Sequence, residues 1–276
     1  MPDQVRHDCG KGEGVTEKTA CHGCWIKSGL SVQKINNSTT QQLNTETLIT
    51  RWIQRKGHDR LLLFFNGWGM DGGIAEYLQS NTPADFRYDV LLCYDYRSLL
   101  MPQDVLETIA SYGERILVAW SLGVWAAQKA GLSGIGRALA INGTLNPISS
   151  EEGISPAIFS QTLGNYNEEN RTRFIRRMCG SSSLFHRFMA VSPERNALDQ
   201  KEELASIQQH VEEDTLQQPS SWSYTHALIG GRDMIFSPKA QKFAWRDLEY
   251  SISEDMPHFP FFSSTSWPEV CSCMDH

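Results

Sequence analysis

A short apolar run that ends at a serine and then changes into an amphipathic helical pattern constrains the fold of this chain more than any other feature. The run covers residues 116–119, and the helical pattern extends from Ser121 to Gly131. Where a strand passes through a sharp turn into a helix, the residue in the turn is exposed at the edge of the sheet. The small residues Ala119 and Gly123 let the backbones beside such a turn approach closely. The pattern predicts that Ser121 is a presented nucleophile; the alternative is a serine buried between a strand and a helix.

Alternating strand and helix patterns predict an α/β fold with a mainly parallel sheet and helices on both faces. Most of the strand runs are continuously apolar, which is typical of strands covered on both sides. We expect strands at residues 50–54, 60–65, 90–94, 116–119, 138–141 and 225–229, and helices at residues 102–112 and 122–130. We expect the first two strands to form an opening hairpin through the turn at residues 55–59.

The pattern changes between Asn142 and Ser223, where the strand signal disappears. Two or three amphipathic helices are expected there, at residues 156–163, 168–178 and 197–211. Because this insertion lies between a strand and the candidate acid described next, we interpret residues 146–222 as a small helical lid.

A serine hydroxyl is a weak nucleophile at neutral pH, so it needs a histidine to take its proton and a carboxylate to orient that histidine. In α/β-hydrolases these residues occur in the order serine, acid, histidine, each after a strand. Asp233 follows the expected strand at residues 225–229 and a Gly-Gly turn, and His258 follows a further short strand. Between them, Ser237 is expected to cap a helix that begins at Pro238. The pattern predicts Ser121, Asp233 and His258 as a catalytic triad in an α/β-hydrolase fold.

Both partners of the serine have ordinary alternatives. An aspartate after a Gly-Gly turn is often only a turn former or a helix cap, but Asp233 follows the expected strand and precedes the expected histidine. The chain has eight histidines, of which one can be the base. We expect surface or core roles for the others, which are His7, His22, His58, His186, His210, His226 and His276.

The charge that develops on a carbonyl oxygen during acyl transfer is stabilised by two backbone N–H groups. One is expected from Leu122, the residue after the nucleophile, and the other from the loop after an early strand. Residues 66–70 form such a loop, and the glycines on both sides of Trp68 permit unusual backbone angles. We expect the amides of Trp68 and Leu122 to form the oxyanion hole. The alternative for the loop is an ordinary turn packed by a tryptophan.

Four motifs occur in order along the chain. They are Asn66-Gly67-Trp68-Gly69-Met70-Asp71, Tyr94-Asp95-Tyr96-Arg97, Trp120-Ser121-Leu122-Gly123 and Pro257-His258-Phe259-Pro260-Phe261. Together they resemble the BioG family of pimeloyl-acyl-carrier-protein methyl ester esterases of biotin synthesis, distant relatives of BioH. The resemblance covers residues 49–262 and implies an α/β-hydrolase fold, with Ser121 as nucleophile, Asp233 as acid, His258 as base, and Trp68 and Leu122 as oxyanion donors. BioH-like relatives commonly have a histidine where this chain has Asn66, so the hydrogen bonding of the loop is expected to differ.

Composition agrees with a single catalytic domain in the cytoplasm. The chain has 276 residues, of which 40% are hydrophobic, and a formal net charge of -7. Such a length can bury one large core. The apolar runs are far shorter than the roughly 20 residues of a membrane span, and residues 1–30 lack the apolar core of a secretory signal. We expect a hydrolase domain at residues 49–262, with tails at residues 1–48 and 263–276.

The N-terminal tail contains Cys9 and a Cys21-His22-Gly23-Cys24 motif. A structural zinc site usually needs a second pair of ligands at suitable spacing, and a candidate second pair, Cys271 and Cys273, lies near the other end. The seven cysteines form no convincing disulfide framework. We expect no metal and no organic cofactor. The tail is compatible with a fusion remnant, a mistaken start or a genuine appendage.

Five arginines and no acidic residue lie between residues 171 and 193 of an otherwise acidic chain. They are Arg171, Arg173, Arg176, Arg177 and Arg187, of which the first four are candidate docking residues. Guanidinium groups favour phosphate and carboxylate partners, so an acidic acyl-carrier protein with a phosphopantetheine arm would suit this segment. The alternative is a solvated helix face paired with Glu168, Glu169 and other local acids. Nucleic acid is not expected, because basic and aromatic residues are not interleaved, and no membrane partner is expected.

The expected reaction is hydrolysis of the methyl ester of a carrier-bound pimeloyl chain, through an acyl-enzyme on Ser121. The pimeloyl chain rests on the resemblance, because a triad defines acyl transfer and not the acyl group. An acyl thioesterase or a general short-chain carboxylesterase is the main alternative, and a non-catalytic hydrolase-fold binding protein is a more remote one. A haloalkane dehalogenase is disfavoured, because its nucleophile is an aspartate at the position of Ser121.

Overall fold

The computed structural model describes residues 47–213 and 220–274. Cys9, the Cys21–Cys24 motif and nearly all of the expected N-terminal tail lie outside the described residues, as does His276. The described chain begins beside the sheet, where Leu48 is buried and its N–H donates to the carbonyl of Leu100 at 2.9 Å.

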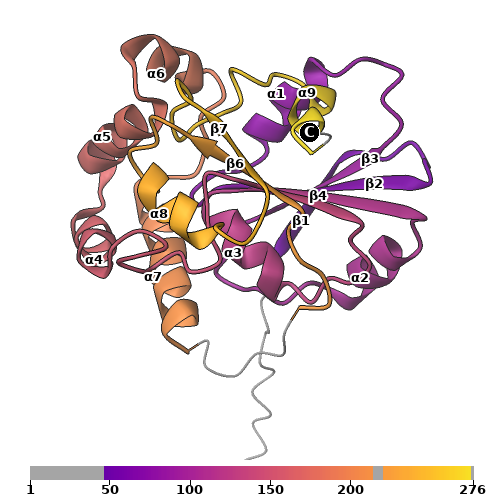
Figure 1. Cartoon of the computed structure of the whole chain (residues 1–276), viewed down its shortest axis with the longest axis horizontal. Coiled ribbons are helices and arrows are strands. Elements are labelled where there is room, and N and C mark those ends of the chain that lie inside the picture. The colour runs from indigo at the N-terminus through magenta and orange to yellow at the C-terminus, as the bar shows by residue number, and fades with distance from the viewer. Residues whose placement is uncertain (1–46, 214–219, 275–276) are drawn as a thin grey trace, which may run out of the picture. The chain divides into compact units, whose positions relative to one another are not determined.

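A seven-stranded sheet forms the centre of the described residues (Figure 1). Its strands are β1 (Ile49–Gln54), β2 (Arg60–Phe65), β3 (Asp89–Tyr94), β4 (Glu114–Trp120), β5 (Arg137–Ile141), β6 (His226–Gly230) and β7 (Tyr250–Ser253). They lie in the order β1-β3-β2-β4-β5-β6-β7. Strand β1 runs antiparallel to β3, and the other pairs are parallel. The predicted mainly parallel α/β sheet is therefore confirmed.

The expected opening hairpin is wrong, because β3 lies between β1 and β2. Strand β1 pairs with β3, with Ile49 opposite Tyr94, whereas β2 pairs with β3 and β4. Every residue of β2 after Arg60 is buried, so this strand needs a neighbour on each side. Strand β1 is partly exposed, which suits the edge of a sheet. The turn after β1 is held on β3, where the Asp89 carboxylate accepts a hydrogen bond from the Lys56 N–H at 2.7 Å.

Helices cover both faces of the sheet. They are α1 (Gly73–Ser80), α2 (Gln103–Ala110), α3 (Leu122–Lys129), α4 (Pro156–Asn165), α5 (Glu168–Cys179), α6 (Ser182–Met189), α7 (Ala197–Glu213), α8 (Pro238–Ala244) and α9 (Trp267–Ser272). Leu61 and Leu63 of β2 pack in one apolar cluster with residues of α2 and α3. Leu62 and Phe64 point to the opposite face and pack with residues of α1 and α9. Burial on both faces explains why the central strands are continuously apolar.

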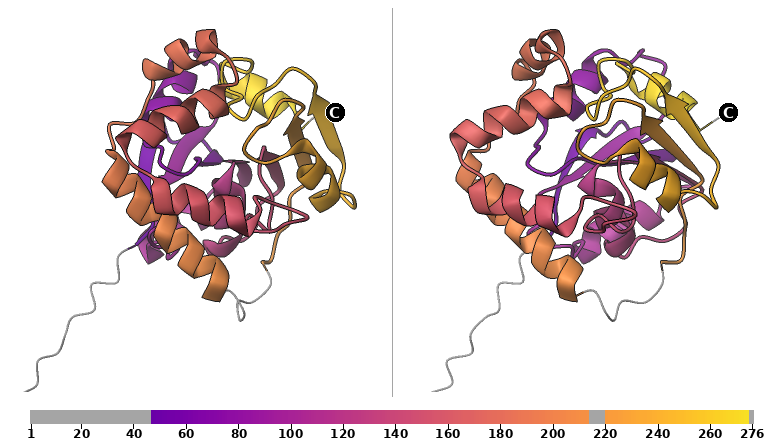
Figure 2. Two further views of the ribbon diagram at one scale, coloured as in Figure 1. Left: turned by 90° about the vertical axis from the view of Figure 1, so that its left-hand side faces the viewer. Right: turned by 60° about the vertical axis from the view of Figure 1, so that its left-hand side comes forward.

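Between β5 and β6, the described residues form four helices, which we call the α4–α7 insertion. They form an arc beside the sheet in both views of Figure 2. The expected helices at residues 156–163, 168–178 and 197–211 correspond to α4, α5 and α7, and α6 is additional to them. Ser181 begins α6 by accepting a hydrogen bond from the Leu184 N–H. That this insertion acts as a lid stays a prediction.

Residues 263–274, expected as part of a C-terminal tail, contain α9 and pack on the sheet. Trp267 is fully buried, and its ring centroid lies 5.2 Å from that of Phe64 on β2. The Trp267 N–H donates to the hydroxyl of Thr82 at 3.0 Å. This segment therefore completes the covering of one sheet face.

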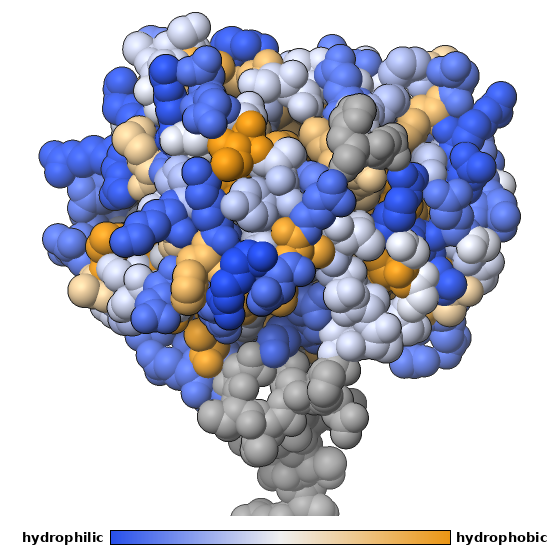
Figure 3. Space-filling model, viewed as in Figure 1, coloured by the Kyte–Doolittle hydropathy of each residue, from blue (hydrophilic) through white to orange (hydrophobic). Residues whose placement is uncertain are grey.

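The surface in Figure 3 is mainly polar, with apolar residues that occur singly or in small groups. Scattered exposed apolar residues are normal on protein surfaces. Across residues 47–213 and 220–274, every helix is too short or too polar to span a membrane.

Candidate active site

Ser121 lies in the turn between β4 and α3, in a strained backbone conformation. Its φ is +59°, a region that residues other than glycine rarely adopt. The Ser121 N–H donates to the carbonyl of Ile141 at the end of β5, at 2.9 Å. A Cβ atom at Gly123 would lie 2.4 Å from the carbonyl oxygen of Asn66 and 2.6 Å from that of Phe65. Glycine at this position therefore lets α3 pass close to the end of β2 and fixes Ser121 at the carboxyl edge of the sheet.

The imidazole of His258 connects Ser121 with Asp233. Its Nε2 lies 2.9 Å from Ser121 Oγ, and its Nδ1 lies 2.9 Å from Asp233 Oδ2. All three side chains belong to buried residues. They follow β4, β6 and β7, whose parallel direction brings their carboxyl ends to one edge of the sheet. This arrangement can pass a proton from the serine hydroxyl to the imidazole while the carboxylate orients the ring.

Asp233 is held by several donors besides the imidazole. Its Oδ1 accepts hydrogen bonds from the backbone N–H groups of Ile235 at 2.7 Å and Phe236 at 2.9 Å. Its Oδ2 accepts from Gln241 Nε2, on α8, at 3.0 Å. The aspartate therefore shapes the turn after β6, which is the ordinary alternative for an aspartate at this position, and it contacts His258 at the same time.

A buried asparagine after β5 fixes the segment that carries His258. Asn142 Nδ2 lies 2.9 Å from the carbonyl oxygens of both Pro257 and His258, and Oδ1 accepts from the Gly230 N–H at 2.7 Å. The indole of Trp120, the residue before Ser121, also donates to the His258 carbonyl, at 2.8 Å. The ends of β4, β5 and β6 therefore fix the position of this imidazole.

The loop after β2 brings Trp68 into the pocket that Ser121 and Leu122 line. The indole of Trp68 packs against Tyr166 and Phe174, with ring centroids 4.9 and 5.1 Å away. Within the described parts of the chain, the backbone N–H groups of Trp68 and Leu122 form no hydrogen bond. Both are therefore free to donate to a ligand bound at Ser121.

Asn66 closes this loop with its side chain. Its Nδ2 donates to the Asp71 carbonyl at 2.9 Å, and its Oδ1 accepts from the Gly67 N–H at 2.9 Å. The hydroxyl of Tyr96 donates to the Asn66 backbone carbonyl at 2.5 Å. Through these hydrogen bonds, the asparagine stabilises the start of the loop.

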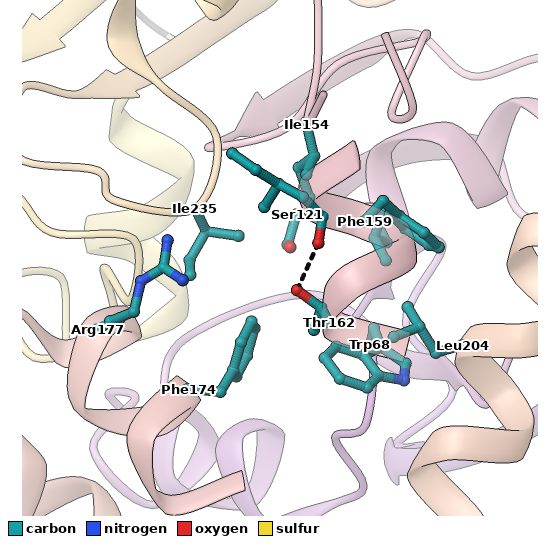
Figure 4. Close-up of a pocket in the computed structure, with 11 residues that line it drawn as sticks. Trp68, Ser121, Ile154, Phe159, Thr162, Phe174, Arg177, Leu204 and Ile235 are labelled. Atoms are coloured by element: carbon teal, nitrogen blue, oxygen red, sulfur yellow. Dashed lines mark hydrogen bonds between the residues drawn. The ribbon is translucent and has the colours of Figure 1, made fainter. Parts of the chain in front are cut away.

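The pocket above Ser121 is mainly apolar (Figure 4). Most of its lining comes from the α4–α7 insertion, including Phe159, Phe174 and Leu204. The dashed line in Figure 4 marks the bond from the Thr162 hydroxyl to the Ile158 carbonyl, 2.8 Å long. Arg177 is the charged residue of the lining and lies across the pocket from Leu204 (Figure 4).

Two of the candidate docking arginines have acidic partners on their own helix. Arg171 pairs with Glu168 at 3.3 Å, and Arg173 pairs with Glu169. Arg171 also donates to the Pro193 carbonyl at 3.1 Å. For these two residues the structure agrees with the alternative of a helix face paired with local acids.

Arg176, Arg177 and Arg187 differ from them, because none forms an ion pair with another described residue. The guanidinium of Arg176 lies 4.1 Å from the ring centroid of Phe185. Arg177 Nη2 donates to the carbonyl of Met234 at 2.8 Å, next to Asp233 in the sequence. Cation–π and carbonyl contacts leave the positive charge of these side chains unneutralised.

Helix α7 contributes two polar residues that no motif indicates. Gln200 and Glu203 are buried and share a face of α7 with Leu204 and Ile207. Gln200 Nε2 donates to the Gly69 carbonyl, and Glu203 accepts from the Gly69 N–H. A polar residue on an otherwise apolar helical stripe is a signal that could have identified them. Asn142 and Gln241 offer no such local signal.

The cysteines of the described region are free thiols. Cys93 and Cys179 are buried, and burial raises the pKa of both, that of Cys179 to about 12. Over the two described ranges, no group of three or more histidine, cysteine, aspartate or glutamate residues is arranged to hold a metal ion. The expectation that the reaction uses no metal or organic cofactor stays a prediction.

Comparisons with known proteins give the family. A family profile described as pimeloyl-ACP methyl esterase BioG matches residues 48–270. Malonyl-[acyl-carrier protein] O-methyltransferase of Bacteroides fragilis is 43% identical over 188 residues, which is 67% of this chain and 36% of that protein. The chain therefore spans about a third of the length of this relative.

Solved structures agree with the profile. The crystal structure of selenomethionine BioG from Haemophilus influenzae covers 80% of this chain and 99% of its own, with 29% identity and a TM-score of 0.71. A hydrolase from Oleispira antarctica, 14% identical, covers 76% of this chain and 87% of its own with a TM-score of 0.51, and this likeness concerns the fold alone. Because the profile covers most of the sequence, the chain belongs to the BioG family and has the α/β-hydrolase fold.

Proposed function

We propose that this protein is a serine esterase that hydrolyses the methyl ester of pimeloyl-acyl-carrier protein in biotin synthesis and releases methanol. The observation that carries the proposal is the hydrogen-bonded series Ser121, His258 and Asp233 beside an apolar pocket. The description of the matching family supports the substrate. The relative from Bacteroides fragilis is named for placing a methyl group on carrier-bound malonyl, and the proposed reaction removes a methyl group from a carrier-bound acyl chain.

The first half-reaction forms the acyl-enzyme. The bond between Asp233 and Nδ1 leaves the lone pair of His258 on Nε2, which faces Ser121. This nitrogen takes the serine proton as Oγ attacks the carbonyl carbon of the methyl ester. The amides of Trp68 and Leu122 stabilise the oxyanion. His258 then gives the proton to the departing methoxide, and methanol leaves.

The second half-reaction releases the product. Water attacks the acyl-enzyme carbonyl while His258 takes one of its protons, and the proton then returns to Ser121 Oγ. The product is a free carboxylate at the end of the acyl chain. The thioester to the carrier stays intact, because the methylene chain keeps it away from the serine.

The lining of the pocket supports an acyl substrate. Phe159, Phe174 and Leu204 offer apolar contact to methylene groups, and each buried methylene contributes about 0.8 kcal/mol. The reacting ester lies at Ser121 in this arrangement, and the carrier end of the chain extends toward the solvent.

Mass spectrometry of pimeloyl-carrier-protein methyl ester after incubation with the enzyme tests the proposal. We expect demethylation by the wild type and a loss of about 10⁶-fold in kcat for Ser121→Ala. Ser133→Ala, at an exposed serine in the loop before β5, is the matched control and should keep full activity. Release of the whole acyl chain would make the protein a thioesterase. No reaction with the wild type would contradict both activities.

We also propose that the carrier protein docks at Arg176 and Arg177. Their charges are not neutralised by acidic neighbours within the described residues, and Arg177 lines the pocket of Ser121. A carrier bound there would lie beside the pocket that receives its acyl chain. An acidic carrier is attracted to such a positive patch on an enzyme that is negative overall.

Charge reversal separates docking from chemistry. Arg176→Glu should raise KM for the carrier-bound ester by about 10-fold and leave turnover of a small soluble ester unchanged. Arg177→Glu should also raise KM for the carrier-bound ester. Because this substitution also removes the hydrogen bond to the Met234 carbonyl, its effect should be less selective for that substrate. Arg60→Glu, at the start of β2 and the opposite edge of the sheet, is the control. Equal losses on both substrates would contradict docking at this patch.

A further inference from the structure

Helix α7 holds both backbone polar groups of the residue that follows Trp68. Glu203 Oε2 accepts a hydrogen bond from the Gly69 N–H at 3.0 Å, and Gln200 Nε2 donates to the Gly69 carbonyl at 2.8 Å. The Trp68 indole donates to the backbone carbonyl of Gln200 at 2.7 Å. Gly69 has a φ of +74°, a conformation that favours glycine. We call these three bonds the α7 clamp.

The side chains of the α7 clamp are themselves fixed. Glu203 is fully buried, and its second oxygen accepts from the Tyr96 N–H at 3.0 Å. Arg195 Nη1 donates to Glu203 Oε2 at 2.7 Å and thereby compensates the buried charge. Gln200 Oε1 accepts from the Tyr166 hydroxyl at 2.9 Å, so the orientation of its amide is determined. A rigid support of this kind limits the movement of whatever it holds.

We infer that Gln200 and Glu203 are positioning residues for the oxyanion hole, and that α7 belongs to the fixed frame of the active site and not to a movable lid. This inference rests on the proposed function, because it takes the Trp68 amide as an oxyanion donor. Neither side chain lines the pocket of Ser121, so both act through the backbone of Gly69. Misplacing a catalytic group by about 1 Å can cost about 100-fold in rate.

Two substitutions of similar shape test the clamp. Gln200→Met removes the donor to the Gly69 carbonyl, and Glu203→Gln replaces one acceptor oxygen by a donor. Each should lower kcat for the small ester p-nitrophenyl butyrate by about 100-fold, with less than about a 3-fold change in KM. Active sites are counted by labelling with a fluorophosphonate, so that misfolded protein does not contribute. Glu212→Gln, at an exposed position of the same helix, is the matched control and should behave as the wild type.

Hydrogen exchange followed by mass spectrometry measures the loop without any turnover. Peptides that cover residues 66–71 should exchange faster in both clamp variants than in the wild type and in Glu212→Gln, whereas peptides from β4 should not change. A wild type without esterase activity would refute the proposed function and leave this measurement of the clamp intact. Unchanged kcat in both variants, or unchanged exchange at residues 66–71, overturns the inference.

Discussion

Three residues at the carboxyl ends of parallel strands have positive φ although none of them is glycine. They are Asp95 after β3, Ser121 after β4 and Asn142 after β5, with φ of +63°, +59° and +47°. Such conformations cost about 1–3 kcal/mol each and persist where the surroundings hold them in place. Asp95 is held by Arg97 and Arg195, and Asn142 by its hydrogen bonds to β6 and to the segment of His258. Backbone strain is therefore concentrated at the edge of the sheet that carries the candidate site.

Asn142→Ala should destabilise the protein by about 3 kcal/mol. The substitution leaves the Gly230 N–H and the Pro257 carbonyl without their partner, and each buried unpaired group costs about 1–3 kcal/mol. We also expect a lower kcat, because His258 loses one of the bonds that hold its backbone. Urea denaturation measures the free energy of unfolding. Asn146→Ala, at an exposed position nearby, should change it by less than about 0.5 kcal/mol, and equal effects of the two substitutions would contradict the assigned role.

The proximity of Ser121, Asp233 and His258 follows from local patterns, because each residue comes after a strand whose end is visible in the sequence. Their catalytic roles stay a prediction. Asn142 also follows an expected strand, yet its partners Gly230 and Pro257 lie 88 and 115 positions away. Contacts at that distance depend on the packing of the whole sheet, so no local pattern encodes them.

Helix α5 ends against the segment that carries His258. The Phe259 N–H donates to the carbonyl of Met178, in the last turn of α5, at 3.1 Å. Gly180 ends the helix with a φ of +70°. A Cβ atom there would lie 3.1 Å from Pro257 Cβ. The α4–α7 insertion is therefore joined to the active-site edge through α5 as well as through α7.

Gly180→Ala should destabilise the protein by about 1–2 kcal/mol, because an alanine is strained at positive φ. The contact with Pro257 adds to this cost. Thermal denaturation measures the effect. Gly164→Ala is a control for which the opposite effect is expected. Gly164 lies inside α4, and a Cβ atom added there would meet open space. Alanine at this position should therefore stabilise the protein by about 0.5–1 kcal/mol. A loss of stability at position 164, or a gain at position 180, would contradict this account.

Helices and strands with a strong hydrophobic periodicity could be predicted from the sequence. Which strands pair with each other could not be predicted. The apolar runs of β2 to β5 are continuous because both faces of these strands are buried, and α4, α5 and α7 begin close to their expected residues. The expected hairpin of β1 with β2 is wrong because β3, and not β2, pairs with the edge strand β1. This pairing depends on the burial of all three strands. Helix α9 is short, and Trp267 stabilises it through a distant contact with β2.

A network of charged side chains joins the insertion to the segment after β3. Arg195, Asp199 and Glu203 come from the insertion, and Asp95 and Arg97 come from the segment after β3. Arg195 Nη2 lies 3.3 Å from Asp95 Oδ2, and Arg97 Nη1 lies 3.0 Å from Asp199 Oδ1. Because buried charges need their partners, such a network favours one docking of the insertion over others.

Glu203 should make stability decrease as pH rises from about 4.5 to about 7. Burial raises the pKa of this carboxyl from 4.5 to about 7, against the opposing effect of Arg195 and in the same direction as the effect of Asp95. Between these values the folded protein binds more protons than the unfolded chain. The contribution of Glu203 is therefore complete below pH 4.5, and up to about 3 kcal/mol is lost as the pH passes the folded pKa.

Chemical denaturation of the wild type and of Glu203→Gln at a series of pH values measures this contribution. Other groups contribute to the pH dependence of both proteins, so the difference between the two proteins is the informative quantity. The free energy of unfolding of the variant should rise relative to that of the wild type as the pH rises. Parallel profiles for the two proteins would contradict a raised pKa at Glu203.

The α7 clamp has a consequence for protein engineering. An exchange of the entire segment between β5 and β6 for that of another hydrolase would remove Gln200 and Glu203 together with both bonds of Gly69. A graft confined to α4–α6 that keeps Tyr166, which fixes the Gln200 amide, would replace Phe159 and Phe174 in the pocket and leave both bonds of Gly69 in place. The substrate range of this scaffold can therefore be redesigned in the first part of the insertion, whereas α7 has to be kept together with the hydrolase core.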